Sequence, residues 1–329
     1  MKNKDVIALF VLTRFLSVVI VQTWYVPDEY WQSLEVAHNI AFGYGYLTWE
    51  WILGIRSYIY PLIIAFIYKF LEVLHLDYVE ALIYFPRILQ ASLSAYADLC
   101  FYQWCKTKKW AAFSIVTSWF WFYTSSRTII NSLETALTTI ALSRFPWPGQ
   151  NIGSNKFLII VAFVCSIRPT AAIHWLPLCI YHLIVSKDKL LLLILKWYFP
   201  IGLVTLILST LIDSCAHGSF IITSYEFLKL NVLHGVGEWY GSQPWSWYLS
   251  SGFPAILGIH FVPFVIASFK IIKDRQLYQN ELALLGCITF TLFIYSLLPH
   301  KEFRFILPLL PIALNISSGH LSRWSHKAN

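Results

Sequence analysis

Two adjacent carboxylates, Asp28 and Glu29, follow the first apolar segment of the chain. At that depth a carboxylate can act as a general base, taking a proton from a sugar hydroxyl of a lipid-borne substrate while the oxygen attacks an anomeric carbon. The alternative is an acidic pair that only ends a helix in the headgroup region, which is the commoner case in membrane proteins. Asp28 and Glu29 are therefore candidate catalytic residues, and the pair by itself decides little.

A dense group of charges occupies the string HKEFRF, residues 300–305, between two apolar runs. Charge beside a membrane is costly unless it is paired or functional. On a helix, His300, Lys301 and Arg304 would share one face, which suits the phosphate of a leaving group. The alternative is a helix end whose long side chains extend to the interface while Glu302 neutralises a neighbour. We predict that His300, Lys301 and Arg304 bind a donor phosphate.

Further ionisable groups lie inside apolar segments. Arg168 precedes Pro169, which interrupts the backbone ladder and frees polar groups that a cavity could use. An arginine at such a depth is a functional candidate, and we add Arg168 to the predicted phosphate-binding set. Arg127, Asn131 and Glu134 recur with helical spacing and would form one polar stripe. The alternative is that this stripe only holds neighbouring helices together.

Two stretches between apolar runs, 25–57 and 213–247, combine polar side chains with aromatic rings that could stack on sugars. For any single ring, a place in the interfacial aromatic belt is the commoner explanation. The candidate acceptor-binding or sugar-binding residues are Trp31, Glu50, Arg56, Glu238, Trp239, Tyr240 and Trp245.

Several familiar cofactor motifs are missing from the sequence. There is no GxxxxGK[ST] phosphate loop, no GxGxxG, no HExxH and no DxD-type acidic pair, and the six cysteines show no metal-ligand spacing. We therefore predict no metal site and no cofactor, and a donor that is activated without a nucleotide.

The composition places this chemistry in a membrane. Of 329 residues, 57% are hydrophobic and 12% are charged, and the mean hydropathy is +0.60, which exceeds the balance of a soluble domain. The net charge of +7 could suggest nucleic acid. However, the lysines and arginines cluster in short segments beside apolar runs, where the positive-inside rule expects them. We predict a polytopic membrane protein that binds no nucleic acid.

About ten segments approach the ~20 residues needed to cross a bilayer. They are 6–24, 58–75, 82–104, 110–126, 128–145, 157–185, 190–212, 248–270, 281–299 and 303–320. With no soluble domain and no repeat, the chain is predicted to be one all-α transmembrane domain over residues 1–329, built of transmembrane or re-entrant helices.

Topology follows from the basic residues. If Lys2 and Lys4 are cytoplasmic and successive apolar segments cross the membrane in alternating directions, the stretches 25–57 and 213–247 lie together on the opposite face as two lumenal loops. Alternation fails at residues 106–109, where three lysines would fall on the wrong side. One segment between 58 and 145 is therefore predicted to be re-entrant or interfacial.

Seven strings of the sequence carry a resemblance to a known family. They are VPDEYWQSLEVAH (26–38), YGYLTWEW (44–51), GIRSYIYPL (54–62), RTIINSLET (127–135), IRPTA (167–171), FLKLNVLHGVGEWYGSQPWSWY (227–248) and HKEFRF (300–305). In this order they resemble the motifs of glycosyltransferase family 22, which has the GT-C fold, and the resemblance extends over residues 26 to 312.

The resemblance implies a multi-pass enzyme of the endoplasmic reticulum membrane with a lumenal active site. It implies dolichyl-phosphate mannose as the lipid-linked donor, a GPI-anchor precursor as the acceptor, and one inverting displacement that forms an α-1,2 linkage. Asp28 would be the base, and no protein partner is implied. The sequence departs from the family at Val26, Ser242, Gln243 and Ser246, and relatives usually continue beyond the position of Asn329.

Two alternatives remain open at this point. One is a mannosyltransferase that uses the same donor and extends the dolichol-linked N-glycan precursor. The other belongs to a different class, a membrane lipid or solute transporter, because an intramembrane arginine and a polar stripe could also line a permeation path. The charges concentrate on one face and we detect no paired inverted halves, which favours the enzyme.

Overall fold

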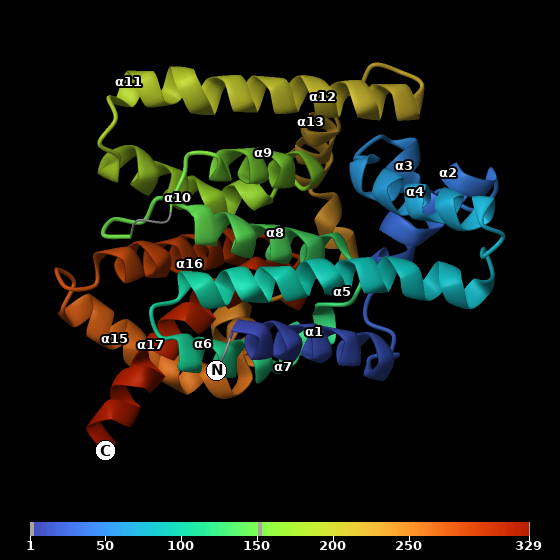
Figure 1. Cartoon of the computed structure of the whole chain (residues 1–329). Coiled ribbons are helices and arrows are strands. Elements are labelled where there is room, and N and C mark those ends of the chain that lie inside the picture. The colour runs from blue at the N-terminus through green and yellow to red at the C-terminus, as the bar shows by residue number, and fades with distance from the viewer. Residues whose placement is uncertain (1–2, 151–152, 329) are drawn as a thin grey trace.

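The computed structural model describes residues 3–150 and 153–328, which form helices joined by turns and include no strand (Figure 1). Apolar runs favour helices in a bilayer because only local pairing satisfies every backbone N–H and C=O there. The first part of the chain forms α1 (Asn3–Ile20), α2 (Glu35–Phe42), α3 (Trp49–Ile52), α4 (Ile59–Val73), α5 (Val79–Trp104), α6 (Lys108–Val116), α7 (Trp119–Thr124) and α8 (Ile130–Arg144). The second part forms α9 (Phe157–Ile167), α10 (Ala171–Val185), α11 (Leu190–Leu193), α12 (Phe199–His217), α13 (Thr223–Leu228), α14 (Phe253–Leu257), α15 (Phe261–Lys273), α16 (Gln279–Leu297) and α17 (Leu310–Ala328).

Each of the ten predicted apolar segments is helical in the structure, and the multi-pass membrane class is confirmed. Among the described residues, four helical stretches are long and apolar enough to cross a membrane: Leu190–His217, Tyr248–Lys273, Gln279–Leu297 and Phe303–His326. Two predicted segments are each split into two shorter helices, α6 with α7 and α9 with α10.

The break between α9 and α10 falls where the sequence predicts it. Arg168 leaves the helical conformation, with φ −137° and ψ 98°, as steric contact with a following proline requires. The side chain of Arg168 is thereby placed at a helix end, beside backbone groups that no longer pair within one continuous helix.

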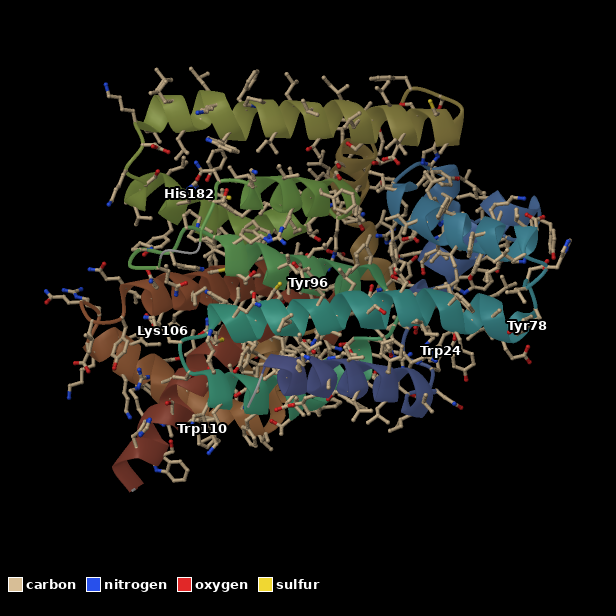
Figure 2. The ribbon with its side chains drawn as sticks, in the orientation of Figure 1. Trp24, Tyr78, Tyr96, Lys106, Trp110 and His182 are labelled. Carbon is tan, nitrogen blue, oxygen red and sulfur yellow. The ribbon has the colours of Figure 1, made fainter. Side chains whose placement is uncertain are left out.

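The segment 58–75 corresponds to α4, which packs on α2 beside the start of α5. In Figure 1 helices α2, α3 and α4 gather at one end of the bundle, where α1 ends and α5 begins. Figure 2 shows Trp24 and Tyr78 towards this end and Lys106 towards the other. The chain thus travels from the end of α1 to the start of α5 without running the length of the bundle, which explains why strict alternation fails at residues 106–109.

Aromatic and aliphatic side chains from most helices meet in one large core, whose biggest fully buried members include Trp175, Phe101 and Tyr248. Helix α12 differs, because most of its apolar side chains point outward. In water such a surface would be unfavourable. In a bilayer it is the expected lipid-facing side of a peripheral span.

A buried carboxylate joins the two predicted loops at the end of α12. Asp213 Oδ1 accepts hydrogen bonds from Ser57 Oγ at 3.0 Å and from the Tyr58 backbone N–H at 2.9 Å. Its Oδ2 accepts one from Thr223 Oγ1 at 2.7 Å. Asp213 therefore fixes the end of the segment 25–57 against the start of α13.

We expect Asp213→Ala to lower the free energy of unfolding by roughly 3 kcal/mol, because three buried donors lose their acceptor at about 1 kcal/mol each. Thermal unfolding in detergent measures the change. Ser209→Ala on the same helix is the control, since its hydroxyl bonds only to the Leu206 carbonyl. Equal unfolding temperatures for the two variants would refute this anchoring role.

Candidate active site

The adjacent carboxylates at residues 28 and 29 face different partners. Glu29 is 4% exposed, and its Oε2 accepts a hydrogen bond from Arg127 Nη1 at 2.8 Å. Asp28 keeps 24% of its side chain exposed, and its Oδ2 accepts from Arg304 Nη1 at 2.5 Å. Of the two candidates, Asp28 is therefore the carboxylate that a substrate hydroxyl can approach.

The late motif is not helical at its charged start. Leu298 ends α16 in an extended conformation with ψ 136°, as the following Pro299 requires. A 3-10 turn begins only at Phe303. The predicted common helical face of His300, Lys301 and Arg304 is therefore wrong, because a proline ends the helix before the motif begins.

Arg304 lies between two carboxylates and is only 7% exposed. Its Nε donates to Glu302 Oε2 at 2.6 Å and its Nη2 to Glu302 Oε1 at 2.7 Å, while Nη1 reaches Asp28. His300 Nε2 lies 2.9 Å from Glu302 Oε1. The structure thus brings the first-loop acid of the predicted site against Arg304 of the late motif, and Glu302 and His300 extend this group of contacts.

The electrostatics of this group keep Glu302 ionised. Burial by itself would raise the pKa of Glu302, but the hydrogen bonds and charge of Arg304, together with those of His300, outweigh burial and hold the pKa below its usual value. Because the folded-state pKa is lowered, the stability that this pairing contributes is present above the ordinary pKa of a glutamate. It is lost as the pH falls through the lowered value.

Arg168 and Arg304 lie beside the same aromatic ring. The guanidinium carbon of Arg168 is 5.7 Å from the centre of the Phe305 ring, and that of Arg304 is 5.5 Å from it. The His300 ring centre is 5.7 Å from the same ring. Three of the four predicted phosphate-binding residues are thus gathered around Phe305, and Arg168 is also ion-paired with Glu134.

Lys301, the fourth member of that set, points elsewhere. Its Nζ donates to the backbone carbonyls of Gln243, at 3.0 Å, and Leu298, at 2.5 Å. The Gln243 backbone N–H donates in turn to the Pro299 carbonyl at 2.9 Å. The ammonium group therefore fastens the segment 213–247 to the late motif.

We expect Lys301→Met to loosen this segment, because the apolar side chain fills similar space but donates no hydrogen bond. Limited proteolysis should cut between residues 230 and 245 several-fold faster than in the unmodified protein. Lys69→Met, at an exposed lysine, serves as the control, since the Lys69 ammonium donates to Glu72 within α4 and contacts the Phe42 ring, and neither partner belongs to the segment 213–247. Unchanged cleavage in Lys301→Met would show that the ammonium group does not hold the segment.

The polar stripe predicted before and within α8 connects three parts of the site. Arg127 reaches Glu29, Asn131 Nδ2 donates to the Arg304 backbone carbonyl at 2.9 Å, and Glu134 pairs with Arg168. The stripe therefore holds neighbouring elements together, as the second interpretation of the sequence expected. Sequence spacing revealed the stripe, whereas its partners are too distant in the chain to be identified from spacing.

The two predicted loops meet at aromatic side chains. Trp49 Nε1 donates to the Tyr240 hydroxyl at 3.2 Å, and the Tyr240 ring centre lies 6.0 Å from that of His300. Trp239 and Trp245 are 84% and 70% exposed. Of the three candidate rings in the second loop, Tyr240 contacts the late motif, while the two tryptophans face outward.

The remaining sugar-binding candidates are Trp31, Glu50, Arg56 and Glu238. Arg56 Nη2 donates to Glu50 Oε1 at 2.6 Å, so this pair is internally satisfied. Trp31 packs edge-on against Tyr46 with ring centres 5.9 Å apart, and Glu238 is exposed. Their assignment to a sugar remains a prediction. Within residues 3–150 and 153–328, no group of three or more histidine, cysteine, aspartate or glutamate side chains could hold a metal ion.

Comparison with known proteins adds a family. A model described as the Alg9-like mannosyltransferase family matches residues 6–329. The chain is 52% identical to GPI mannosyltransferase 3 of Drosophila melanogaster over 329 residues, which is 100% of this chain and 58% of that protein. It is 46% identical to GPI alpha-1,2-mannosyltransferase 3 of Danio rerio (98% of this chain, 61% of that one) and 45% identical to that of Homo sapiens (99% and 60%). The chain thus spans about 60% of the length of these curated relatives.

The fold also has a solved counterpart. The crystal structure of ArnT from Cupriavidus metallidurans bound to undecaprenyl phosphate superposes with a TM-score of 0.65 at 12% identity, over 98% of this chain and 61% of that one. At this identity the likeness concerns the fold alone. It confirms the expected all-α membrane fold of GT-C type.

Proposed function

Because this chain belongs to the Alg9-like mannosyltransferase family, we propose that it transfers an α-1,2-linked mannose to a GPI-anchor precursor as the third mannose. The observation that supports this most strongly is the placement of Asp28. A partly exposed carboxylate lies against Arg304, in a group that His300 and Arg168 complete around Phe305. A base beside cations is the arrangement that glycosyl transfer from a lipid phosphate needs.

In the proposed reaction the donor is dolichyl-phosphate mannose and no cofactor or metal takes part. Asp28 takes the proton of the acceptor hydroxyl while its oxygen forms a bond to the anomeric carbon of mannose. The bond from that carbon to the phosphate oxygen breaks, and dolichyl phosphate departs with the electron pair. One displacement converts the β-linked donor into an α-linked product.

The departing phosphate requires positive charge near the reacting carbon. Arg168 and Arg304 flank Phe305, and each guanidinium carries five N–H donors, more than its bonds to carboxylates use. Removing one such donor from an active site typically costs about 3 kcal/mol of transition-state stabilisation. We assign this role to the two arginines and to His300.

We place the reaction on the lumenal side of the endoplasmic reticulum membrane. The segments 25–57 and 213–247 contact each other through Trp49 and Tyr240, so acceptor and donor could enter beneath them from the bilayer. The exposed rings of Trp239 and Trp245 are available for the acceptor glycan or the interface. The names of the relatives favour a GPI precursor over the N-glycan precursor, and they do not favour a transporter.

Lipid analysis of the source cells after loss of this protein tests the assignment. We expect a GPI precursor with two mannoses to accumulate and surface GPI-anchored proteins to be lost. The lipid-linked oligosaccharide should still reach its full length. Truncated lipid-linked oligosaccharide with normal GPI lipids would instead assign the protein to the N-glycan precursor. Normal amounts of both lipids would exclude either transferase role.

A further inference from the structure

We propose that Glu302 is a positioning residue that fixes the orientation of Asp28 through Arg304, an inference that rests on the proposed function. The geometry is a continuous chain of contacts. Glu302 takes two parallel hydrogen bonds from Arg304, and a third guanidinium nitrogen donates to Asp28. Glu302 is thus linked to the base through the arginine.

The bidentate contact restricts Arg304 more than a single ion pair would. A guanidinium is planar, so two parallel bonds along one edge set the direction of the remaining N–H groups. The main chain is also held, because Asn131 donates to the Arg304 carbonyl at 2.9 Å. Nη1 is thus directed at Asp28 Oδ2, which leaves the second carboxylate oxygen of Asp28 for a substrate hydroxyl.

A role of Arg304 as a simple counter-charge for phosphate explains this geometry less well. If Arg304 served only to attract phosphate, a carboxylate held bidentately against it would reduce the positive potential that phosphate meets. If Arg304 instead orients Asp28, the bidentate contact with Glu302 serves to fix the direction of the guanidinium. A precise orientation matters because general-base catalysis requires the proton and its acceptor to lie within hydrogen-bond distance.

Glu302 is itself held from two sides. His300 Nε2 lies 2.9 Å from its Oε1, and the Tyr248 hydroxyl lies 3.3 Å from its backbone nitrogen and from its carbonyl oxygen. His300 Nδ1 is 3.3 Å from the Gly241 carbonyl oxygen. The orientation of Asp28 in the first loop therefore depends on contacts that reach the second loop.

The test uses the full chain in detergent or membranes and the variant Glu302→Gln. Glutamine has the same size but replaces one acceptor oxygen with an NH2 group, which cannot accept a bond from Arg304. We expect kcat for mannose transfer to fall at least about tenfold, with KM for dolichyl-phosphate mannose within about twofold. Glu72→Gln is the matched control, since Glu72 is a partly exposed partner of Lys69, and it should leave both constants unchanged.

A double variant separates positioning from an independent contribution. If Glu302 acts mainly through Asp28, then Glu302→Gln should slow mannose transfer much less in the Asp28→Asn background than in the unmodified chain. A loss equal to the product of the two single losses would overturn the proposal. So would a Glu302→Gln variant with unchanged kcat.

Carbodiimide labelling of Asp28, quantified by peptide mass spectrometry, tests the geometry without any transferase activity. Release of Arg304 should make Asp28 react several-fold faster in Glu302→Gln than in the unmodified chain or in Glu72→Gln. Equal labelling rates in all three proteins would overturn the positioning role. If the unmodified chain transfers no mannose while Asp28 still reacts faster in Glu302→Gln, the proposed function is overturned and the positioning role of Glu302 is retained.

Discussion

Asp28→Asn is expected to reduce mannose transfer by about a hundredfold or more, the usual range for loss of a general base. Asparagine keeps the size of the side chain and can still accept a hydrogen bond from Arg304 through its amide oxygen. It cannot take up the hydroxyl proton as a carboxylate does. The protein should therefore fold normally, and the loss should appear in kcat when transfer from radiolabelled donor is measured at saturating substrate.

Asp77→Asn is the matched control for this variant, because Asp77 is an exposed aspartate in the turn before α5. It should transfer mannose at the unmodified rate. If Asp28→Asn also retained transfer within about twofold while remaining folded, Asp28 would not be the base. The candidate to examine next would then be Glu29.

Arg127→Met is expected to lower the free energy of unfolding by about 3 to 5 kcal/mol, the cost of leaving one member of a buried ion pair without its partner. Glu29 would remain buried without its ion-pair partner, since its Oε2 accepts the bond from Arg127. The same change also removes the bond from Arg127 Nη2 to the Thr23 carbonyl at 2.7 Å. Thermal unfolding of the purified protein in detergent measures the effect.

The double variant Arg127→Met with Glu29→Gln provides the internal control. Neutralising Glu29 removes the unpaired charge, so the double variant should be more stable than Arg127→Met alone. A double variant that is less stable than both single variants would mean that the two side chains contribute independently. In that case Glu29 would have another role and could again be considered as the base.

The helical architecture could be predicted because it depends on local information. Apolar runs near the length of a bilayer span give the helices, and Arg168 before Pro169 marks the break between α9 and α10. Pro299 acts equally locally, because it ends α16 and keeps the charged start of the late motif out of a helix. The spacing of the charges alone favours a shared helical face there. The place of α4 could not be predicted from hydropathy, since the run 58–75 is close in length to a bilayer span, while its position depends on packing against α2 and α5.

The pairing of the candidate site could not be predicted from spacing. Asp28 and Glu29 look equivalent in the sequence, and what distinguishes them is a partner 276 residues away for one and 98 residues away for the other. Asp213 shows the same limit, because an aspartate at the end of an apolar run gives no indication that Ser57 and Thr223 will bond to it. Contacts between distant segments are set by the packing of whole helices.

The most direct measurement is the return of GPI-anchored proteins to the surface of cells that lack the third GPI mannosyltransferase, after expression of this 329-residue chain. Low and matched expression, checked in the membrane fraction, keeps the comparison between variants quantitative. We predict that the unmodified chain restores surface GPI-anchored proteins and that Asp28→Asn at the same level does not. An unmodified chain that is present in the membrane and restores none, or an Asp28→Asn chain that restores them equally well, would contradict the account.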